Sequence, residues 1–324
     1  MRFYLLLSFF ALGSLLSCGP SEGAGEEKQK RIAVIPKGTT HIFWKSIHAG
    51  SIKAANELGI EAIWQGPLKE DDRQMQIQVV QNFISQGVDG IVLAPLDSRA
   101  LIAPVKAAQN RGIPVIIIDS GLEEDAYKSF IATNNLEGGK MCAKRLAELL
   151  GERGKVIMMR YMEGSASTTA REKGFMEAIQ SYPEIEIISD NQFAGATMEK
   201  AFQASQNLLN RFPEVDGIFC PNESSTQGML RALQTAGRTA SVQFVGFDSN
   251  PTLIQALEKE EIKGLLVQDP FDMGYLGVKT MAEVLEGKEV ANQIDTRVMM
   301  ITPENMQEEE AQALLKPDIE AFVQ

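Results

Sequence analysis

The chain has 324 residues, of which 44% are hydrophobic and 23% are charged, and its formal net charge is −12. This length and composition are typical of a globular protein with two domains. An acidic chain without a run of Lys and Arg argues against nucleic acid as a partner, because contacts to phosphates need clustered cations.

Residues 1–17 have the pattern of a signal peptide, because Arg2 precedes an apolar run that is too short to span a membrane. The run ends in "LLSC" at Cys18, which resembles a bacterial lipobox with a lipidated cysteine; a plain secretory peptide is the alternative. Residues 18–30 are rich in Gly and Glu, which predicts a flexible, lipid-anchored tether. We therefore expect an exported lipoprotein of the periplasm or cell envelope, held to an inner or outer membrane only by its lipid.

Short apolar runs recur from residue 31 onwards with helical segments between them. One such segment begins near Asp72 and ends at Gly87, with Met75, Val79 and Phe83 on one apolar stripe. The runs are continuous rather than alternating, which is typical of strands that are covered on both faces of a parallel sheet. They are "RIAVIP", "GIVLAP", "PVIIID", "KVIMMR", "IEIIS", "GIFC", "VQFVGFD" and "GLLVQ".

Three pairs of these segments repeat in the same order at offsets of 124 to 129 residues, including "VDGIVLAP" and "VDGIFCPN". The repeat predicts an α/β protein with two doubly wound parallel-sheet lobes. We expect the chain to cross between the lobes near residues 129–135 and again near 268–270. The first lobe would then contain residues 31–132 and 269–293, and the second would contain residues 133–268 and 294–324. A final strand near "TRVMMI" and a C-terminal helix from Pro303 would complete the fold.

The motifs of common enzyme classes are absent from the sequence. It has no G-x-G-x-x-G after a strand, no Walker loop, no H-E-x-x-H and no G-x-S-x-G. The only two histidines, His41 and His48, lie in one early segment. Cys142 and Cys220 could pair in an oxidising compartment, but their spacing favours two buried free thiols. We therefore expect a binding protein without a metal or a cofactor, and not an enzyme.

Polar and aromatic side chains follow several predicted strands, at the edge where ligands bind in open parallel sheets. Acids and amides bond to hydroxyl groups, cations donate to oxygens, and flat aromatic rings cover C–H faces. The set therefore favours a sugar-sized polyol in a cleft between two lobes. The candidate ligand-binding residues are Lys37, His41, Phe43, Trp44, Asp119, Ser120, Arg171, Asn222, Asp248 and Gln268.

Several candidates also have a purely structural interpretation. Asp119 and Asp248 could cap helices, since each is followed by Ser and by a helical start. Phe43 and Trp44 could form a hydrophobic staple, and His41 could be an exposed loop residue. The equivalent places of the two aspartates in a duplicated lobe favour ligand contact.

From about residue 31 to residue 302 the sequence resembles the periplasmic sugar-binding proteins of the ribose-binding type, which share their core with lac-repressor-like regulators. The stretches that carry the resemblance are "QGVDGIVLAP", "GIPVIIIDS", "ATNNLEGGK", "TAREKGF", "NESSTQGMLRALQTAG", "FVGFD" and "QDPFDMG". The family implies two lobes, a hinge of three crossovers, a monosaccharide in the cleft and delivery to an ABC permease. The signal-peptide pattern argues against a repressor.

The resemblance also implies residue roles. Phe43 and Trp44 fall on two stacking aromatics, and His41 replaces a usual Asn. The residues that fall where ribose-type proteins hold sugar hydroxyls are Asp119, Arg171, Asn222, Asp248 and Gln268, the last of them at the hinge.

Three departures from the ribose pattern stand out. Lys37 lies where a small polar residue is expected, and Ser120 lies where ribose binders have Arg. Our hypothesis is that Lys37 supplies the donor that Ser120 no longer can. A third stacking aromatic is absent, since its place falls near Ala196.

The segment "IPK" at residues 35–37 also resembles the receptors for the furanosyl signal autoinducer-2, in which that Lys contacts the ligand. Asp119 and Pro221 fit that pattern, whereas Arg171 and Glu223 do not. A chemosensory binding protein is a further alternative, with a chemoreceptor as its partner, and an enzyme is the least favoured one. We expect a monomer that closes about its hinge when ligand bridges the lobes.

Overall fold

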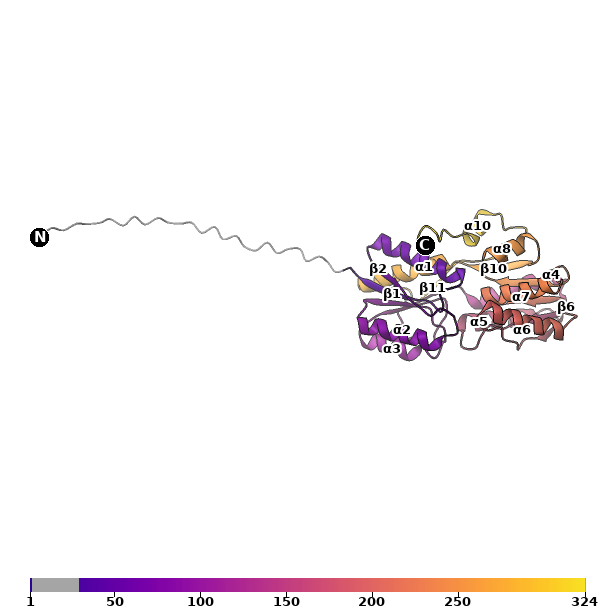
Figure 1. Ribbon diagram of the computed structural model, residues 1–324, viewed down its shortest axis with the longest axis horizontal. Helices are drawn as coiled ribbons and strands as arrows, with labels where there is room; N and C mark the ends of the chain where they lie inside the picture. The colour runs from indigo at the N-terminus through magenta and orange to yellow at the C-terminus, as the bar shows by residue number, and fades with distance from the viewer. Residues whose placement is uncertain (2–28, 324) are drawn as a thin grey trace.

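The structure is a computed structural model that describes residue 1 and residues 29–323. It contains two six-stranded sheets that form two lobes lying side by side (Figure 1). No helix between residues 29 and 323 is long and apolar enough to cross a membrane. The predicted signal peptide and the lipidation site at Cys18 lie outside the described residues.

The first lobe is built on the sheet with the strand order β11-β5-β4-β3-β1-β2. All its neighbouring strands are parallel. Its strands are β1 (Arg31–Ile35), β2 (Glu61–Trp64), β3 (Gly90–Leu93), β4 (Val115–Ile118), β5 (Ser129–Ala132) and β11 (Gln293–Asp295), and its helices are α1 (Ile42–Leu58), α2 (Arg73–Gln86), α3 (Ile102–Asn110) and α9 (Pro270–Leu285).

The second lobe repeats this plan with the strand order β12-β10-β9-β8-β6-β7. Only β12 runs antiparallel, against β10. Its strands are β6 (Arg153–Met158), β7 (Glu184–Ser189), β8 (Gly217–Phe219), β9 (Gln243–Phe247), β10 (Gly264–Gln268) and β12 (Val298–Ile301), and its helices are α4 (Asn135–Leu150), α5 (Ala166–Ile179), α6 (Met198–Arg211), α7 (Glu223–Thr235), α8 (Pro251–Glu258) and α10 (Glu309–Leu315). The predicted fold class is therefore confirmed, and the repeated segments occupy matching positions in the two sheets.

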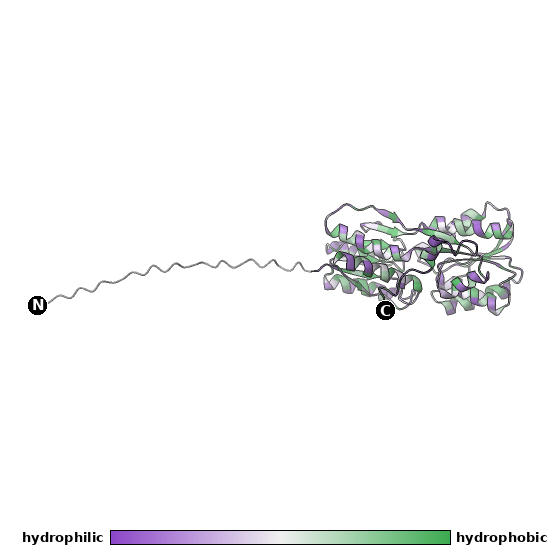
Figure 2. Ribbon diagram, turned by 90° about the horizontal axis from the view of Figure 1, so that it is seen from above, coloured by the Kyte–Doolittle hydropathy of each residue, from purple (hydrophilic) through white to green (hydrophobic). Residues whose placement is uncertain are grey.

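The strands bury side chains on both faces, which explains their continuous apolar sequences. In β1, Ile32 and Val34 pack beneath α1 and α9, whereas Ala33 and Ile35 pack beneath α2 and α3. The second lobe has the same two layers, with α4 and α5 on one face and α6, α7, α8 and α10 on the other. The helices alternate hydrophobic and hydrophilic residues along their length, as expected for a single buried face (Figure 2).

Close helix crossings fix the elements that carry the polar residues. α1 packs against α9, and α4 packs against α5. A Cβ atom on Gly274 would overlap the backbone carbonyl of Ile47, and one on Gly139 would overlap that of Arg171. Glycine is therefore required at both crossings, and the second crossing fixes the height at which Arg171 lies above its sheet.

The chain passes between the lobes three times, as expected. The crossings are residues 133–134, residue 269 and residues 296–297. The first and third crossings lie close together, with 3.5 Å between the hydroxyl oxygens of Thr133 and Thr296. Strand β11 belongs to the first sheet up to Asp295, so the predicted lobe boundary at residue 293 lies inside this strand.

Two details of the sequence analysis were wrong. Met75 was expected on the apolar stripe of α2 but is 44% exposed, and the polar Gln76 is buried instead. The last helix was expected from Pro303, but residues 303–308 form turns and α10 begins at Glu309. The chain then returns to the first lobe, where the ring of Phe322 lies 5.9 Å from that of Phe271 (Figure 1).

Candidate functional site

A buried polar cavity lies between the lobes, at the carboxyl ends of both sheets. It is lined by nine of the ten predicted residues, namely Lys37, His41, Phe43, Trp44, Asp119, Arg171, Asn222, Asp248 and Gln268. The cavity also has six lining residues that were not among the ten candidates: Glu70, Tyr161, Ser165, Ser167, Thr168 and Glu223. The two lobes therefore contribute to one shared site, as parallel sheets with facing carboxyl ends should.

Asp119 and Asp248 occupy equivalent positions directly after β4 and β9. Both have left-handed backbone conformations, with φ of 61° and 68°, which Asp adopts more easily than most residues. Neither caps a helix, because the next element after Asp119 is β5 and the cap of α8 is Asn250. Their helix-cap interpretation is therefore wrong, and the unusual backbone aims both carboxylates into the cavity.

The Asp119 carboxylate is paired with Lys37. The distance from Lys37 Nζ to Asp119 Oδ2 is 2.6 Å, and each residue is 4% exposed. The Lys37 ammonium also donates to the hydroxyl of Ser167 in the second lobe, at 3.2 Å. Ser120 does not line the cavity, and its hydroxyl accepts a hydrogen bond from the backbone of Ser167.

Arg171 is held rigidly on the other side of the cavity. Its Nε donates to the side chain of Asn135 at 2.8 Å, and an Nη donates to the carbonyl of Pro221 at 2.9 Å. The guanidinium carbon lies 3.8 Å from the centre of the Phe247 ring. The same Nη lies 3.9 Å from Asp248 Oδ2, and this is the loosest ion pair in the site.

Asp248 has a second set of partners that links it to the hinge. Its Oδ1 accepts a hydrogen bond from the Gln268 amide at 2.6 Å, and its Oδ2 accepts from the backbone N–H of Glu223 at 3.0 Å. Asn222 lines the cavity and also caps α7, since its side chain accepts from the backbone of Ser225. The site residues of the second lobe are thus held in position by hydrogen bonds within that lobe.

Phe43 and Trp44 form an aromatic wall in the first turn of α1. Their ring centres are 4.9 Å apart and their planes are nearly perpendicular, which is the edge-to-face arrangement that aromatic quadrupoles favour. Both rings line the cavity, although they also belong to the core beneath α1. The indole N–H of Trp44 donates to the Glu70 carboxylate at 2.6 Å.

Glu70 is the most important residue that the sequence analysis missed. It is 7% exposed, and its Oε1 lies 2.7 Å from Nδ1 of His41. Its Oε2 accepts a hydrogen bond from the hydroxyl of Tyr161 at 2.6 Å. Glu70 lies in the loop after β2, so the rule that polar side chains gather at strand ends would have found it if β2 had been recognised.

The charges of His41 and Glu70 depend on each other. Burial alone would lower the pKa of His41, but the carboxylates of Glu70, Glu223 and Asp248 together outweigh it and raise the pKa to about 9. Burial alone would raise the pKa of Glu70, but His41, Lys37 and Tyr161 lower it to about 2. The pair is therefore ionised at neutral pH.

These shifts couple the site to stability. A raised histidine pKa gives stability that is complete below the ordinary value of 6.5 and is lost as pH rises through about 9. A lowered glutamate pKa gives stability that is present above 4.5 and is lost as pH falls through about 2. Burial raises the pKa of both Glu223 and Asp248, so these carboxyls hold their protons more strongly than usual.

The cavity is small in this closed arrangement. Its volume is about 30 Å³. Ligand sites usually enclose roughly 300–1,000 Å³, so a sugar can enter this cavity only when the lobes move apart. Among residues 29–323, no group of three or more His, Cys, Asp and Glu is arranged to hold a metal ion.

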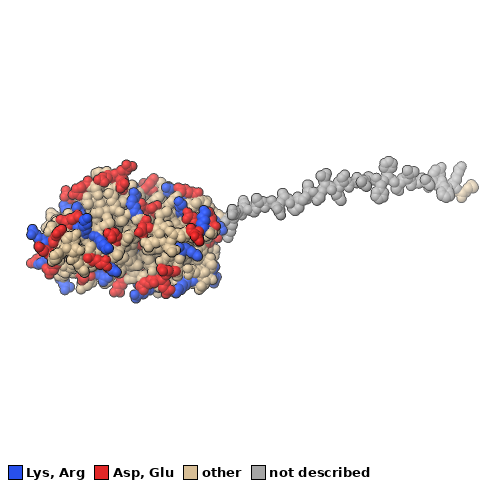
Figure 3. All heavy atoms as spheres, turned by 180° about the vertical axis from the view of Figure 1, so that it is seen from behind, with Lys and Arg blue, Asp and Glu red and all other residues tan. Residues whose placement is uncertain are grey.

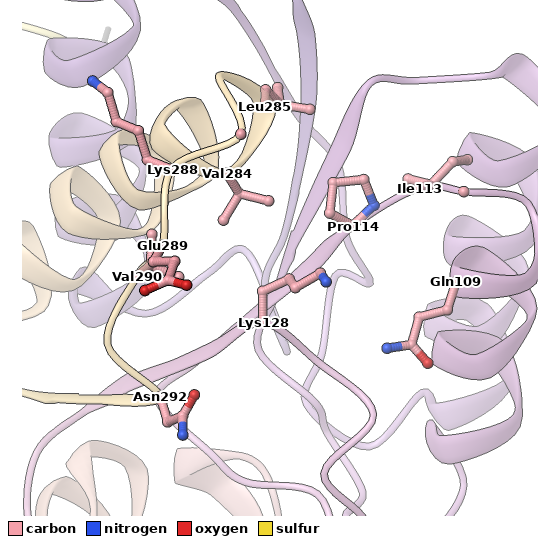
Figure 4. Close-up of a pocket in the computed structure, with 12 residues that line it drawn as sticks. Gln109, Ile113, Pro114, Lys128, Val284, Leu285, Lys288, Glu289, Val290 and Asn292 are labelled. Carbon is pink, nitrogen blue, oxygen red and sulfur yellow. The ribbon is translucent and has the colours of Figure 1, made fainter.

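A larger cavity of about 860 Å³ lies entirely within the first lobe, near the end of α9 (Figure 4). Its charged lining residues, Lys128, Lys288 and Glu289, are exposed, and none belongs to a buried pair. Acidic and basic side chains are also interspersed over the surface seen in Figure 3. Buried charges converge between the lobes, so the interlobe cavity is the stronger candidate site.

Comparisons with known proteins agree with this geometry. A family profile described as a periplasmic binding protein domain matches residues 32–289. The ribose import binding protein of Bacillus subtilis is 27% identical over 303 residues, which cover 92% of this chain and 97% of that protein.

Two solved structures show the same fold over nearly the whole described chain. A carbohydrate transporter solute binding protein from Agrobacterium radiobacter, in complex with D-arabinose, has a TM-score of 0.86 at 30% identity and covers 90% of this chain and 100% of its own. An ABC transporter solute binding protein from Agrobacterium vitis with bound D-fucose has a TM-score of 0.85 at 33% identity and covers 88% of this chain and 100% of its own.

Proposed function

The chain belongs to the periplasmic binding protein domain family, and from this membership we propose that it binds a monosaccharide between its lobes for delivery to an ABC import permease. The related proteins are named for ribose import or contain D-arabinose and D-fucose. We infer that the ligand is a neutral sugar of this size.

The observation that carries the proposal is the convergence of Asp119, Asp248 and Arg171 on one cavity that also has an aromatic wall. Carboxylates accept hydrogen bonds from neighbouring hydroxyls, and a guanidinium donates to hydroxyl and ring oxygens. Aromatic faces cover the C–H face of a sugar ring. Because the groups come from both lobes, only a closed protein presents all of them to one ligand.

The charges of the site favour a neutral ligand. Lys37 faces Asp119, and His41 faces Glu70. Arg171 faces Asp248. Each cation therefore has an acidic partner, and a polyol can exchange hydrogen bonds with these three pairs without leaving a cation unpaired.

The mechanism we propose is closure about the three-crossover hinge. Separation of the lobes breaks the bonds from Lys37 to Ser167 and from the backbone of Phe43 to Glu223, which exposes the polar groups to solvent. A sugar that bridges the lobes restores these interactions through its own hydroxyls and shifts the equilibrium to the closed form. The permease then recognises the closed arrangement of the two lobes.

We further propose that the protein is an exported, monomeric lipoprotein anchored through Cys18. Export and the lipid anchor are supported by the position of Cys18 at the end of the apolar run and by the polar tether that leads to β1. Metabolic labelling with a fatty acid should mark the wild-type chain and leave Cys18→Ser unmarked. Equal labelling of both proteins would contradict the anchor.

The proposed function is tested by calorimetric titration with D-ribose, D-allose, D-arabinose and D-fucose. We expect at least one sugar to bind and to be recovered unchanged. Saturation at a hundredfold excess over Kd should also stabilise the fold by about 2.7 kcal/mol. Binding of a furanosyl signal but of none of the sugars would replace this proposal with the signal-receptor alternative.

A pair of variants isolates the role of the site. Arg171→Lys keeps the charge but removes the planar donor fork, so it should abolish measurable binding. Arg145→Lys is the matched control, because Arg145 is partly buried in the same lobe and donates to the carbonyl of Lys263. Retained affinity in Arg171→Lys would remove the central donor from the proposal.

A further inference from the structure

Glu70 gathers three hydrogen-bond donors on one buried carboxylate. His41 and Trp44 approach Oε1 from the first lobe, at 2.7 Å and 2.6 Å. Tyr161 approaches Oε2 from the second lobe, at 2.6 Å. Glu70, Trp44 and Tyr161 are all at least nine-tenths buried, so water does not compete for these bonds.

Tyr161 makes the tightest of the bonds that join the lobes across the cavity. The other bonds there that involve side chains are longer. They are 3.1 Å from the backbone of Ser167 to Ser120, 3.2 Å from Lys37 to Ser167 and 3.4 Å from the backbone of Phe43 to Glu223. An O–H···O⁻ distance of 2.6 Å is typical of a charge-assisted bond, which is roughly twice as strong as a neutral one. The Glu70 carboxylate, which accepts a hydrogen bond from Trp44 of the aromatic wall, is therefore also the group to which Tyr161 of the second lobe bonds on closure.

We infer that Glu70 is a positioning residue that couples lobe closure to the orientation of Trp44. When the lobes close, the Tyr161 hydroxyl occupies one oxygen of Glu70, while the other oxygen holds the indole N–H of Trp44. When they open, Glu70 loses its partner from the second lobe and the indole loses part of the support for its orientation. The aromatic wall is thus fully ordered only in the closed protein.

A role confined to the first lobe is not sufficient to explain this arrangement. Folding of that lobe would need only the bonds from His41 and Trp44, both of which use Oε1. Oε2 is bonded to Tyr161, which lies 91 positions away and follows the first strand of the other lobe. The carboxylate therefore has one oxygen for each lobe.

The first experiment needs no ligand and measures the lobes of the full chain by small-angle X-ray scattering. Tyr161→Phe removes only the hydroxyl that bonds to Glu70, so the ratio of closed to open protein should fall about tenfold or more. Lys200→Met is the matched control, because the Lys200–Asp71 pair also joins the lobes but is exposed. An unchanged scattering profile for Tyr161→Phe, or an equal change in the control, would overturn the inference.

The second experiment follows Trp44 directly. The chain has two tryptophans, so Trp64→Phe leaves Trp44 as the only source of tryptophan emission. In this background Glu70→Gln should shift the emission of Trp44, since the indole loses a charged acceptor. It should also open the lobes as Tyr161→Phe does. An unshifted emission in the Glu70→Gln protein would show that Glu70 does not position the indole.

The effect on affinity rests on the proposed function and is measured separately. Tyr161→Phe should raise the Kd for the sugar about tenfold or more, because less of the protein is closed. If the lobes open as expected but no sugar binds the wild-type protein, the coupling stands and the proposed function fails. If sugar binds the wild type and the Kd of Tyr161→Phe equals it, the proposed function stands and the coupling fails.

Discussion

Replacing Lys37 by Met tests how the buried cation is used. Lys37 and Asp119 are each 4% exposed and 2.6 Å apart, so their gross attraction is about 6 kcal/mol at an effective dielectric constant of about 20. Most of this attraction offsets the cost of taking both charges out of water. Removal of one partner leaves the other buried and unpaired, which costs about 3–5 kcal/mol. We expect Lys37→Met to lower the free energy of unfolding by about this amount.

The assay is urea denaturation of four proteins, namely the wild type, Lys37→Met, Asp119→Asn and the double variant. If Lys37 and Asp119 stabilise the fold through their interaction, the double variant should lose less stability than the two single variants lose in sum. The difference, which is the coupling energy, should be about 1–3 kcal/mol. Lys37→Met should also weaken sugar binding about tenfold or more, because a buried donor to the ligand is lost.

The control for this experiment is Lys53→Met, because Lys53 forms an exposed pair with Glu57 at 4.0 Å. Such a pair contributes about 0–1 kcal/mol, so the change in stability should be small. A loss below about 1 kcal/mol in Lys37→Met, or exact additivity in the double variant, would refute the reasoning. Unchanged affinity would separately remove Lys37 from ligand binding.

The remaining predictions concern pH and packing. The urea midpoint should fall as pH rises from 6.5 to 9, because folded His41 keeps a proton that the unfolded chain releases, and His41→Gln should flatten this part of the curve. A midpoint that rises over this interval would contradict the pairing with Glu70. Gly274→Ala should lower the unfolding free energy by about 2 kcal/mol or more, since its Cβ would overlap the α1 backbone. Gly121→Ala, which meets only one atom at 3.8 Å, should change the midpoint little; similar losses in both variants would refute the packing argument.

Much of the fold could be predicted because parallel strands bury both faces. Each of the eight apolar runs is a strand, and the internal repeat in the sequence predicted the two lobes. Three strands were missed. β2 and β11 lie at sheet edges and have few buried residues, so their sequences carry no continuous apolar signal. β5 is buried inside the first sheet, but its sequence SFIA has only three apolar residues in a row. Met75 was placed on the wrong side of α2 because the buried amide of Gln76 donates to two backbone carbonyls, which an apolar pattern cannot reveal.

The positions of the site residues could be predicted, but their partners could not. The strand-end rule depends only on topology, and it found both Asp119 and Asp248. The bonds of Glu70 depend on how far the lobes close, which sequence spacing does not encode. Ser120 is a second case in which the partner could not be predicted. It follows β4, but its hydroxyl accepts a hydrogen bond from the backbone of Ser167 and does not line the cavity.

The compensated charges of the cavity lead to a final prediction about the ligand itself. A neutral aldose can bridge Arg171 and Asp248, the loosest pair at 3.9 Å, by accepting from one and donating to the other. A sugar acid would bring a further negative charge near Glu223 and Asp248, whose raised pKa values already show that a negative charge is unfavourable there. D-Ribonate should therefore bind at least about a hundredfold more weakly than D-ribose in a calorimetric titration at pH 7, since an uncompensated buried charge costs several kcal/mol. Tighter binding of the acid would mean that Lys37 or His41 is released from its carboxylate to meet the ligand, and the site would then have to be described as one for anionic sugars.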